Sequence, residues 1–534
     1  MKKLLYSILL LPALVSGQTQ IQNYTKVTQH RDSLPNGATN ISVVYYDGLG
    51  RPIQQIANKQ SNQGKNIVTH IEYDQFGRQT RDYLPFANQA TDLEFDLSAR
   101  DNTDQFYLNY SSPTAYPYSE KFLEASPHNT LLKQAAPGET WAGDPESDND
   151  HAIKFVHSTN DSLEVKRFSV LLGTNTQSLA DNGFYEKEQL YKTITKDENW
   201  ISGVNNTTEE FKDKSGRVIL KRTYCDGVKH DTYYVYDVYG NLTYVIPPLV
   251  SDVATQLNTL CYQYKYDGRN RLVEKKLPGR DWEFIVYDNL DRVALTGPAL
   301  SPFGTPATGW LFTKYDAHGR IAYTGWYTGY GVSSQTRATL AEEVAGLGTY
   351  EIKYPTAQTS PDPHMLINYY ENKQVFPLGN YYVLSIQYYD DYKFNTPPSS
   401  YTTAETTGWT KIFYNNATRR PVGLPTGSWL RIPTNVNEAL GNRKNMLYDS
   451  KGREVRVNTL NYLGGTSKFR TTYDFSSKVT FTWREHKRLA SDGAFVVQEF
   501  FTYTPEDRLL DHKHKIRNRA DELLSHNEYD ALGQ

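Results

Sequence analysis

Two groups of side chains in this sequence have the types and spacing of metal ligands. Asp144, Asp148 and Asp150 belong to an acidic stretch with alternating carboxylates, the oxygen donors that a Ca²⁺ loop supplies. The stretch lacks the central glycine and the distal glutamate of an EF-hand, so a solvated acidic loop is the simpler interpretation. His512 and His514 would lie on one face of a strand, but the sequence places no third ligand beside them. We therefore predict no metal site.

Carboxylate pairs are the remaining candidates for catalysis. Asp390 and Asp391 form such a pair, and a glycosidase needs two carboxylates on either side of the sugar bond. Sequence alone does not set the separation that this reaction requires. The chain has no Gly-x-Ser-x-Gly motif, no Walker loop, no dinucleotide fingerprint and no His-Glu-x-x-His. We predict no catalytic residue and no cofactor, and a polysaccharide-active enzyme remains as an alternative.

The elements that carry these residues are set by a repeated phrase: Tyr-Asp, two variable residues, then Gly-Arg. Clear copies begin at Tyr46, Tyr73, Tyr315 and Tyr448, and successive tyrosines lie 21 to 30 residues apart within each block. A unit of that length holds two or three strands with their turns, and stacked units bury the face that one unit cannot. The repeat residues are Tyr46, Asp47, Gly50, Arg51, Tyr73, Asp74, Gly77, Arg78, Tyr236, Asp237, Gly240, Tyr266, Asp267, Arg271, Tyr287, Asp288, Arg292, Tyr315, Asp316, Gly319, Arg320, Tyr448, Asp449, Gly452, Arg453, Tyr529, Asp530 and Gly533, with a weaker copy at Asp213, Gly216 and Arg217.

Turn chemistry explains the fixed letters of this phrase. Runs of β-branched and aromatic residues flank each copy, which is the pattern of a β-hairpin. Asp is favoured at the first position of a type I turn, and Gly takes the left-handed conformation three residues later. Where Gly is absent, the residue is Asn270, Asp291 or Asp507, and Asn and Asp tolerate that conformation best. We predict that Tyr packs on the next hairpin, that Arg stacks on a ring or pairs with Asp, and that the whole set is architectural.

The phrase resembles the YD repeat of the RHS (rearrangement hotspot) and teneurin-like superfamily over roughly residues 41–86, 211–325 and 445–534. The N-terminal part, with Tyr45 to Gln54, resembles a Bacteroidetes version. The resemblance implies hairpins wound as a spiral sheet around a hollow interior, which in bacterial members encloses a variable C-terminal domain, often a toxin. Many members cut themselves with a pair of aspartates at a core marked by Asp-Pro-x-Gly. Asp144-Pro145 and Asp362-Pro363 lack the following glycine. Because the last repeat is interrupted, we expect either that the cut site and the effector lie beyond residue 534 or that the gene is truncated.

These observations predict an all-β chain of YD-repeat hairpins wound into a spiral sheet or β-shell, with two less regular insertions. The predicted divisions are a signal peptide at 1–17, first repeats at 18–86, an insertion or capping segment at 87–210, a repeat block at 211–325, a second insertion at 326–444 and truncated repeats at 445–534. Helices are expected within 92–105 and over 336–346. Strands are expected at 153–156, 165–172, 189–195 and 381–389. An array that stops within a repeat predicts a loose C-terminus.

The N-terminus and the composition restrict the compartment and the partners. Lys2 and Lys3 precede an apolar run from Leu4 to Val15, which reads as a secretory signal, so we predict a secreted or cell-surface protein. No later segment approaches about 18 uninterrupted apolar residues, which predicts no membrane span. A net charge of −3 with 22% charged residues gives no reason to expect nucleic acid. Tyrosines number 42 against 21 phenylalanines, which suits half-wet sheets and also sugar-stacking surfaces.

Three functions follow from the sequence. The first is a non-enzymatic scaffold that encloses or presents a C-terminal effector domain of the same polypeptide. The second is a cell-surface module that binds glycans or proteins through exposed aromatic rings. The third is the polysaccharide-active enzyme. The tryptophans considered for the second are Trp200, Trp282, Trp310, Trp326 and Trp409.

The two cysteines leave two interpretations open. Cys225 and Cys261 lie beside strand-like runs one to two repeats apart, and an exported compartment permits a disulfide between them. The alternative is a pair of buried free thiols.

Overall fold

The structure, a computed structural model, describes residues 22–32, 34, 37–90, 92–110, 112–173, 177–360, 362, 364–370, 374–394, 410–415 and 418–534. The described part contains 33 β-strands and three α-helices, so the predicted all-β class is confirmed. Every strand ladder is antiparallel, as expected for a chain of hairpins. The signal peptide predicted at 1–17 and Trp409 lie outside the described residues.

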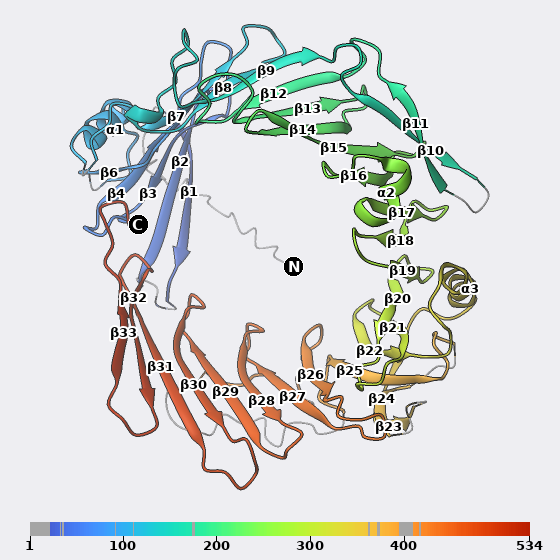
Figure 1. The fold of residues 1–534 in the computed structure, drawn as a ribbon. Coiled ribbons are helices and arrows are strands. Elements are labelled where there is room, and N and C mark those ends of the chain that lie inside the picture. Colours follow the sequence, from blue (N-terminus) through green and yellow to red (C-terminus); the bar gives the residue numbers. More distant parts are fainter. Residues whose placement is uncertain are drawn as a thin grey trace, which may run out of the picture.

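One large sheet forms the body of the molecule, and its strand order closes on itself with β33 next to β5. Figure 1 shows this sheet as a ring. Its strands, in spatial order, are β5 (Arg81–Tyr83), β7 (Tyr118–Leu123), β8 (Leu131–Ala135), β9 (Ile153–Thr159), β12 (Tyr191–Lys196), β13 (Thr207–Lys212), β14 (Val218–Cys225), β15 (Val228–Tyr236), β16 (Leu242–Ile246), β17 (Tyr262–Tyr266), β18 (Leu272–Lys276), β19 (Trp282–Tyr287), β20 (Val293–Leu300), β21 (Thr308–Tyr315), β22 (Ile321–Tyr327), β25 (Tyr381–Tyr389), β26 (Pro425–Arg431), β27 (Gly441–Tyr448), β28 (Glu454–Leu460), β29 (Thr466–Tyr473), β30 (Val479–His486), β31 (Phe495–Tyr503), β32 (Leu509–Ile516) and β33 (Glu522–His526).

Smaller elements attach to this ring. A five-stranded N-terminal sheet is made of β1 (Asn23–His30), β2 (Thr39–Tyr46), β3 (Pro52–Ala57), β4 (Asn66–His70) and β6 (Phe86–Asn88), with helix α1 (Ala99–Leu108) packed on it. The other elements are the pair β10 (Lys166–Leu172) and β11 (Gln177–Phe184), the pair β23 (Ile352–Thr359) and β24 (Leu366–Tyr370), and helices α2 (Val253–Leu260) and α3 (Ser334–Ala345). Much of the segment 87–210 is continuous with the ring, because β7, β8, β9 and β12 are ring strands.

The helices show where sequence signals were sufficient. Helix α3 overlaps the segment expected at 336–346, and a capping box between Ser333 and Thr336 starts it two residues earlier. Helix α1 extends beyond the segment expected at 92–105. Helix α2 was not predicted; Asp252 caps it by accepting a hydrogen bond from the Ala254 N–H. With eight residues it is too short for its periodicity to stand out.

The largest buried cluster lies on the face of the ring that α3 and the segments around it cover. It includes Trp310, Phe312 and Tyr381, each at most 1% exposed, together with Leu340 from α3. Figure 1 places α3, β23 and β24 outside the ring, so this core joins the second insertion to the ring wall. Burial of large aromatic side chains is the main source of stability here.

Buried ion pairs tie the same insertion to the ring. Arg431 on β26 lies 2.5 Å from the Asp362 carboxylate, and both side chains are 0% exposed. Asp362 also accepts the Val383 N–H at 3.0 Å, and Arg431 donates to the Val383 and Glu438 carbonyls at 2.9 and 2.7 Å. These bonds compensate the cost of removing the two charges from water.

Breaking the ion pair between Asp362 and Arg431 is expected to lower the free energy of unfolding strongly. The substitution Asp362→Asn leaves a guanidinium that cannot lose its proton in a buried site, so the free energy of unfolding should fall by about 3–5 kcal/mol. Urea unfolding at neutral pH measures it. Glu485→Gln removes a partly exposed partner of Lys468, at 3.0 Å, and should cost at most about 1 kcal/mol. If the free energy of unfolding fell equally in the two variants, the buried ion pair would not have the stabilising role assigned to it.

Candidate functional site: the turn column

The repeated phrase forms one kind of turn, which the first copy illustrates. The Asp47 N–H donates to the Arg51 carbonyl at 2.9 Å, and the Gly50 N–H donates to the Asp47 carbonyl at 3.0 Å. One carboxylate oxygen of Asp47 accepts the N–H groups of Leu49 and Arg51, both at 2.9 Å. The other accepts the Arg51 Nε at 2.8 Å. The aspartate therefore satisfies the backbone of its own turn and fixes the arginine beside it.

The same turn recurs along the chain. The hydrogen bond from the N–H of the first turn residue, which follows the tyrosine, to the carbonyl four residues later recurs in the turns that start at Asp74, Asp213, Asp237, Asp267, Asp288, Asp316, Asp449, Asp474, Thr504 and Asp530. The arginine Nε donates to the aspartate at 2.7–2.8 Å for Arg78, Arg217, Arg271, Arg292, Arg320 and Arg453. Asn241 takes this place after Asp237, at 3.0 Å. We call these turns together the turn column.

The fourth residue of each turn has the left-handed conformation that the turn requires. Gly50 and Gly319 have φ of 77°, and Asn270, Asp291 and Asp507 have φ of 59°, 60° and 72°. The ladder shifts register beside the tyrosine, as in Tyr315 of the hairpin β21–β22, so each loop is a turn followed by a bulge. The remaining left-handed residues are Gly77, Gly216, Gly240, Gly452, Ser477 and Gly533.

Tyrosine and arginine link each turn to the one before it. The Tyr315 hydroxyl donates to the Val293 carbonyl at 2.8 Å, and the Arg292 guanidinium lies 4.2 Å from the centre of the Tyr315 ring. The accepting carbonyl belongs to the residue directly after the last residue of the preceding turn, which is an arginine in most copies. The same hydrogen bond, at 2.5–3.1 Å, is made by Tyr73, Tyr266, Tyr287, Tyr448, Tyr473, Tyr503 and Tyr529. A cation over the next tyrosine ring recurs at Arg51, Arg217, Arg271, Arg320, Arg453, Lys478 and Arg508.

One copy was missed because its turn is interrupted. Asp390 donates its N–H to the Leu424 carbonyl at 3.1 Å and accepts the Gly423 N–H at 2.7 Å, and Gly423 has φ of 85°. Arg320 lies over the Tyr389 ring at 4.2 Å and pairs with Asp390 at 2.6 Å. Residues 391–422 are thus inserted inside a repeat turn. The only local signal was the Tyr389-Asp390 dipeptide without a nearby glycine.

This geometry gives the acidic pair a structural role. Asp390 is held by Arg320, and Asp391 pairs with Lys353 at 2.6 Å. Lys353 also donates to the Tyr389 carbonyl at 3.0 Å. Both carboxylates are held by cations that position the insertion, which disfavours the glycosidase interpretation of this pair.

Lysines take the place of a metal in the acidic stretch. Asp150 accepts Lys133 at 2.9 Å and Lys154 at 2.8 Å, and Lys196 pairs with Asp148 at 3.0 Å. Burial acts to raise the pKa of Asp150, but the hydrogen bonds from Lys154, the Asp144 N–H and Lys133 outweigh it and lower that pKa to about 2. In the described residues, no group of three or more His, Cys, Asp or Glu side chains is arranged to hold a metal ion.

The two histidines have separate environments. His512 stacks on Phe501 with ring centres 4.6 Å apart and lies 3.4 Å from the Glu499 carboxylate. His514 pairs with Glu522 at 2.9 Å. Each ring is therefore engaged by neighbouring strands.

The cysteines are both free. Cys225 is exposed and Cys261 is buried, so the interpretation as two buried thiols is wrong for Cys225. Burial raises the pKa of Cys261 to about 11.

Of the five tryptophans considered for a stacking surface, the four in the described part of the chain (Trp200, Trp282, Trp310 and Trp326) are all at least partly buried. Trp310 is 0% exposed and belongs to the largest core cluster. Trp326 is 4% exposed, faces the opposite side of the sheet, and packs against Phe303 and Tyr382. Trp282 is partly buried with Lys265 at 4.4 Å from its ring, and Trp200 donates to the Gly203 carbonyl within its own loop. The described part of the chain has no helix with the length and apolar character needed to cross a bilayer.

Comparisons with known proteins follow this geometry. Residues 18–155 match a family described as a domain of unknown function, DUF6443. A search of curated proteins finds no match. The chain is similar to the crystal structure of TcdB2-TccC3, at 15% identity and a TM-score of 0.42, over 96% of this chain and 23% of that chain. It is also similar to TcdB2-TccC3 without its hypervariable C-terminal region, at 15% identity and a TM-score of 0.42, over 96% of this chain and 22% of that chain. A Tc holotoxin pore of Photorhabdus luminescens matches at 16% identity and a TM-score of 0.42, over 96% of this chain and 22% of that chain. The chain therefore spans less than a quarter of the length of these proteins.

A single turn of the column should contribute measurably to stability. Asp288 has a side chain that is 7% exposed, and its carboxylate accepts the N–H groups of Leu290 and Arg292 and the Arg292 Nε. Asp288→Ala leaves these donors unpaired and should lower the free energy of unfolding by roughly 1–3 kcal/mol in urea titrations. Asp281→Ala, at an exposed aspartate, should change it by less than about 0.5 kcal/mol. The architectural role would be excluded if both variants were as stable as the original chain.

The turns also predict an acid limit of stability. In Asp47 the Arg51 N–H is the main cause of a lowered pKa; in Asp74 and Asp213 burial acts to raise the pKa, but hydrogen bonds from Arg78 and Arg217 outweigh it. Because the folded pKa lies below the unfolded value of 3.8, these groups stabilise the fold fully above that pH. Stability should fall as pH decreases below 3.8 through the folded pKa values. Urea unfolding between pH 7 and 2 measures this, and Asp213→Asn should flatten the slope. A slope unchanged by Asp213→Asn would rule the turn carboxylates out as its cause.

Proposed function

We propose that this chain is a non-enzymatic YD-repeat scaffold of the RHS type, in the version that resembles Bacteroidetes proteins. In this role it encloses or presents an effector domain of the same polypeptide that lies beyond residue 534. The observation that carries the proposal is the turn column, in which successive hairpins are linked by a tyrosine hydroxyl, by a cation over its ring or, as at Tyr287 and Tyr315, by both. Linkage between neighbouring hairpins produces a continuous sheet, which suits enclosure better than catalysis in a cleft.

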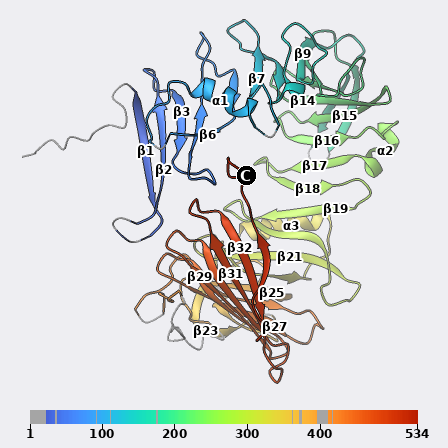
Figure 2. The same ribbon diagram turned by 90° about the vertical axis from the view of Figure 1, so that its left-hand side faces the viewer.

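Contacts between the ends of the described chain support a closed wall. Asp507 accepts Arg31 at 2.9 Å and Asn40 at 3.0 Å. Tyr110 donates to Asp530 at 2.5 Å, and Asn62 donates to the Tyr529 carbonyl at 2.6 Å. The last turns thus dock on the N-terminal part of the chain instead of forming the loose end expected from the sequence. Figures 1 and 2 both show the N-terminal sheet beside strands β31 and β32.

The acidic residues considered as candidates for catalysis or metal binding also support a scaffold. Asp150, Asp390 and Asp391 are each paired with lysine or arginine. Glu209 and Arg222 form a similar buried network with Asp231. These groups stabilise strands and insertions, which is a structural role.

Export and domain organisation complete the proposal. Residues 1–17 would direct secretion, and the mature chain would act outside the cell or at its surface. The proposed parts are first repeats at 18–86, an insertion or capping segment at 87–210, a repeat block at 211–325, a second insertion at 326–444 and repeats at 445–534. Residues 18–155, the part that matches the domain of unknown function, would include the surface on which the last turns dock.

Containment can be tested on the full polypeptide. The reading frame downstream of Gln534 should encode further repeats and an unrelated domain, and that domain should resist protease within the intact protein. Asp507→Ala combined with Tyr110→Phe removes contacts that close the ring and should speed its digestion at least severalfold. Asp281→Ala serves as the matched control and should leave the digestion rate unchanged.

Two results would contradict containment. One is a frame that stops without a further domain. The other is an effector domain digested equally fast in the intact protein and in isolation. Monitoring thermal unfolding of the variants separates local opening of the ring from loss of the fold.

A further inference from the structure

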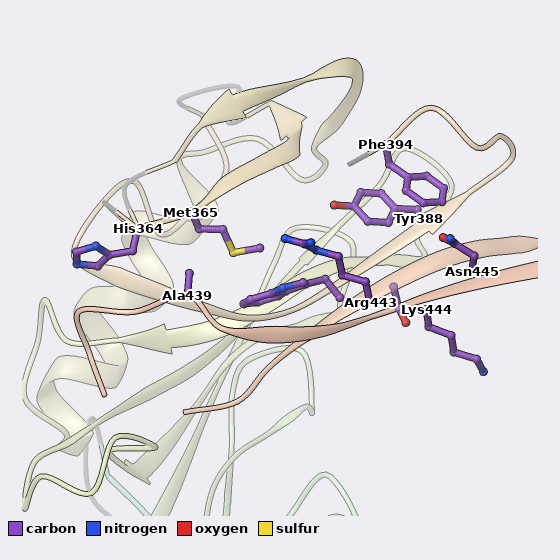
Figure 3. Close-up of a pocket in the computed structure, with 10 residues that line it drawn as sticks. His364, Met365, Tyr388, Phe394, Ala439, Arg443, Lys444 and Asn445 are labelled. Atoms are coloured by element: carbon purple, nitrogen blue, oxygen red, sulfur yellow. The ribbon is translucent and has the colours of Figure 1, made fainter. Parts of the chain in front are cut away.

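Buried side chains hold the ring together near the second insertion. A pocket of about 240 Å³ lies there, between that insertion and strands β25 to β27, and Figure 3 shows the side chains around it. The rings of Tyr388, Phe394 and Trp429 are only 4–7% exposed and belong to the largest core cluster. This part of the ring is therefore stabilised by apolar burial, which does not depend on pH near neutrality.

Strand β33 has no comparable support, although it stands next to β5 where the ring closes. None of its five residues is buried, and Leu523 and Leu524 are 55% and 50% exposed. Its ladder with β32 also shifts register between His512 and Lys513. Segments with few buried apolar contacts open locally at low cost, so charged contacts can decide how firmly β33 is held.

Two reciprocal histidine–carboxylate pairs fasten β33 to β32, one at each end of the ladder. The Nε2 of His514 on β32 lies 2.9 Å from the carboxylate of Glu522 on β33. The Nδ1 of His526 on β33 lies 2.7 Å from the carboxylate of Asp511 on β32. Each pair joins residues that stand directly opposite each other in the ladder, where opposite charges stabilise the pairing of two strands.

His514 has a carboxylate on each side. Glu499 of β31 stands opposite it in the ladder, and Glu522 of β33 pairs with it. The basic groups that contact Glu499 are His512, at 3.4 Å, and Arg484 of β30, at 3.7 Å. Both contacts are longer than the one between His514 and Glu522, so a positive charge on His514 is stabilised chiefly by Glu522.

Asp511 is the carboxylate that faces His526. It lies 2.7 Å from the His526 imidazole and accepts the Thr502 hydroxyl at 3.1 Å. The hydrogen bond from His526 is the main cause of a lowered pKa of Asp511, and the charge of Lys513 contributes to it. Because Asp511 is ionised at neutral pH, a positive charge on His526 lies beside a negative one.

We propose that β33 is a pH-sensitive closing strand, which binds β32 more firmly when His514 and His526 are protonated. An unperturbed imidazole gains its proton below about pH 6.5, whereas unperturbed carboxylates stay charged down to about pH 4. Each pair therefore joins two opposite charges in mildly acidic solution and loses its positive charge as the pH rises toward about 8. Such a strand responds to pH whether or not the ring encloses an effector.

Hydrogen exchange of the whole chain, followed by mass spectrometry at about pH 5.5 and 7.5, measures how often β33 opens. After correction for the intrinsic exchange rate, the peptide that contains β33 should be protected at least about threefold more at the lower pH, because one exposed ion pair shifts an equilibrium constant by up to about fivefold. The hairpin β19–β20, which contains no histidine, is the internal reference and should be protected equally at both. In about 1 M salt the difference at β33 should shrink.

Substitutions separate the two pairs from other effects of pH. The double variant His514→Gln with His526→Gln keeps a hydrogen-bond donor opposite each carboxylate but removes the titration, so it should abolish the difference in protection at β33. Each single variant should lose part of that difference. His486→Gln is the matched control, because His486 bonds to the Ser467 hydroxyl instead of a carboxylate, and it should leave the difference unchanged.

Four results would overturn the proposal. The first is equal protection of the β33 peptide at the two pH values in the original chain, and the second is a difference that high salt leaves unchanged. The third is a difference that persists in the double variant, and the fourth is a difference lost equally in His486→Gln. Because the first two measurements use only the original chain, they decide the proposal even if a variant fails to fold.

Discussion

The structure depends on one repeated linkage, a tyrosine hydroxyl bonded to the carbonyl that follows the arginine of the preceding turn. Tyr287 and Tyr315 make this bond at 2.9 and 2.8 Å. The arginine is itself held by the aspartate of its own turn and covers the next tyrosine ring. Where the aspartate, arginine and tyrosine are all present, these three residues couple a hairpin to its neighbour, so stability propagates between nearest neighbours as in a solenoid. The linkage is confined to the turns, and the strands between them contribute the buried aromatic core.

This arrangement explains where the chain accepts insertions. Residues 391–422 lie inside a turn, yet Asp390 still closes that turn on Leu424 and Gly423. Helix α3 and strands β23 and β24 come between β22 and β25 in the sequence, although β22 and β25 are neighbouring strands of the ring. An insertion is tolerated when the Tyr-Asp end and the left-handed end of the turn still meet.

The sequence predicted what is local and failed where contacts are distant. The aspartate and glycine of each turn act within five residues, so composition and spacing revealed them, including Asn270 and Asp291 in the left-handed position. The copy at Asp390 was missed because its glycine is Gly423, far along the chain. The buried pair of Asp362 and Arg431 requires tertiary placement that no periodicity encodes. Helix α2 was hidden for a different reason, its single short stretch between strands.

Closure of the ring uses the same chemistry as its repetition. Asp507 occupies the left-handed position of its turn and accepts Lys478 of the preceding copy at 2.6 Å. The same carboxylate accepts Arg31 and Asn40 from the N-terminal sheet. Burial acts to raise the pKa of Asp507, but the hydrogen bonds from Lys478, Arg31 and Asn40 lower it, so the group stays charged at neutral pH. One carboxylate thus joins a repeat to its predecessor and to the start of the chain. The turn that follows, at Asp530, adds to the closure, because Tyr110 donates to the Asp530 carboxylate and Asn62 donates to the Tyr529 carbonyl.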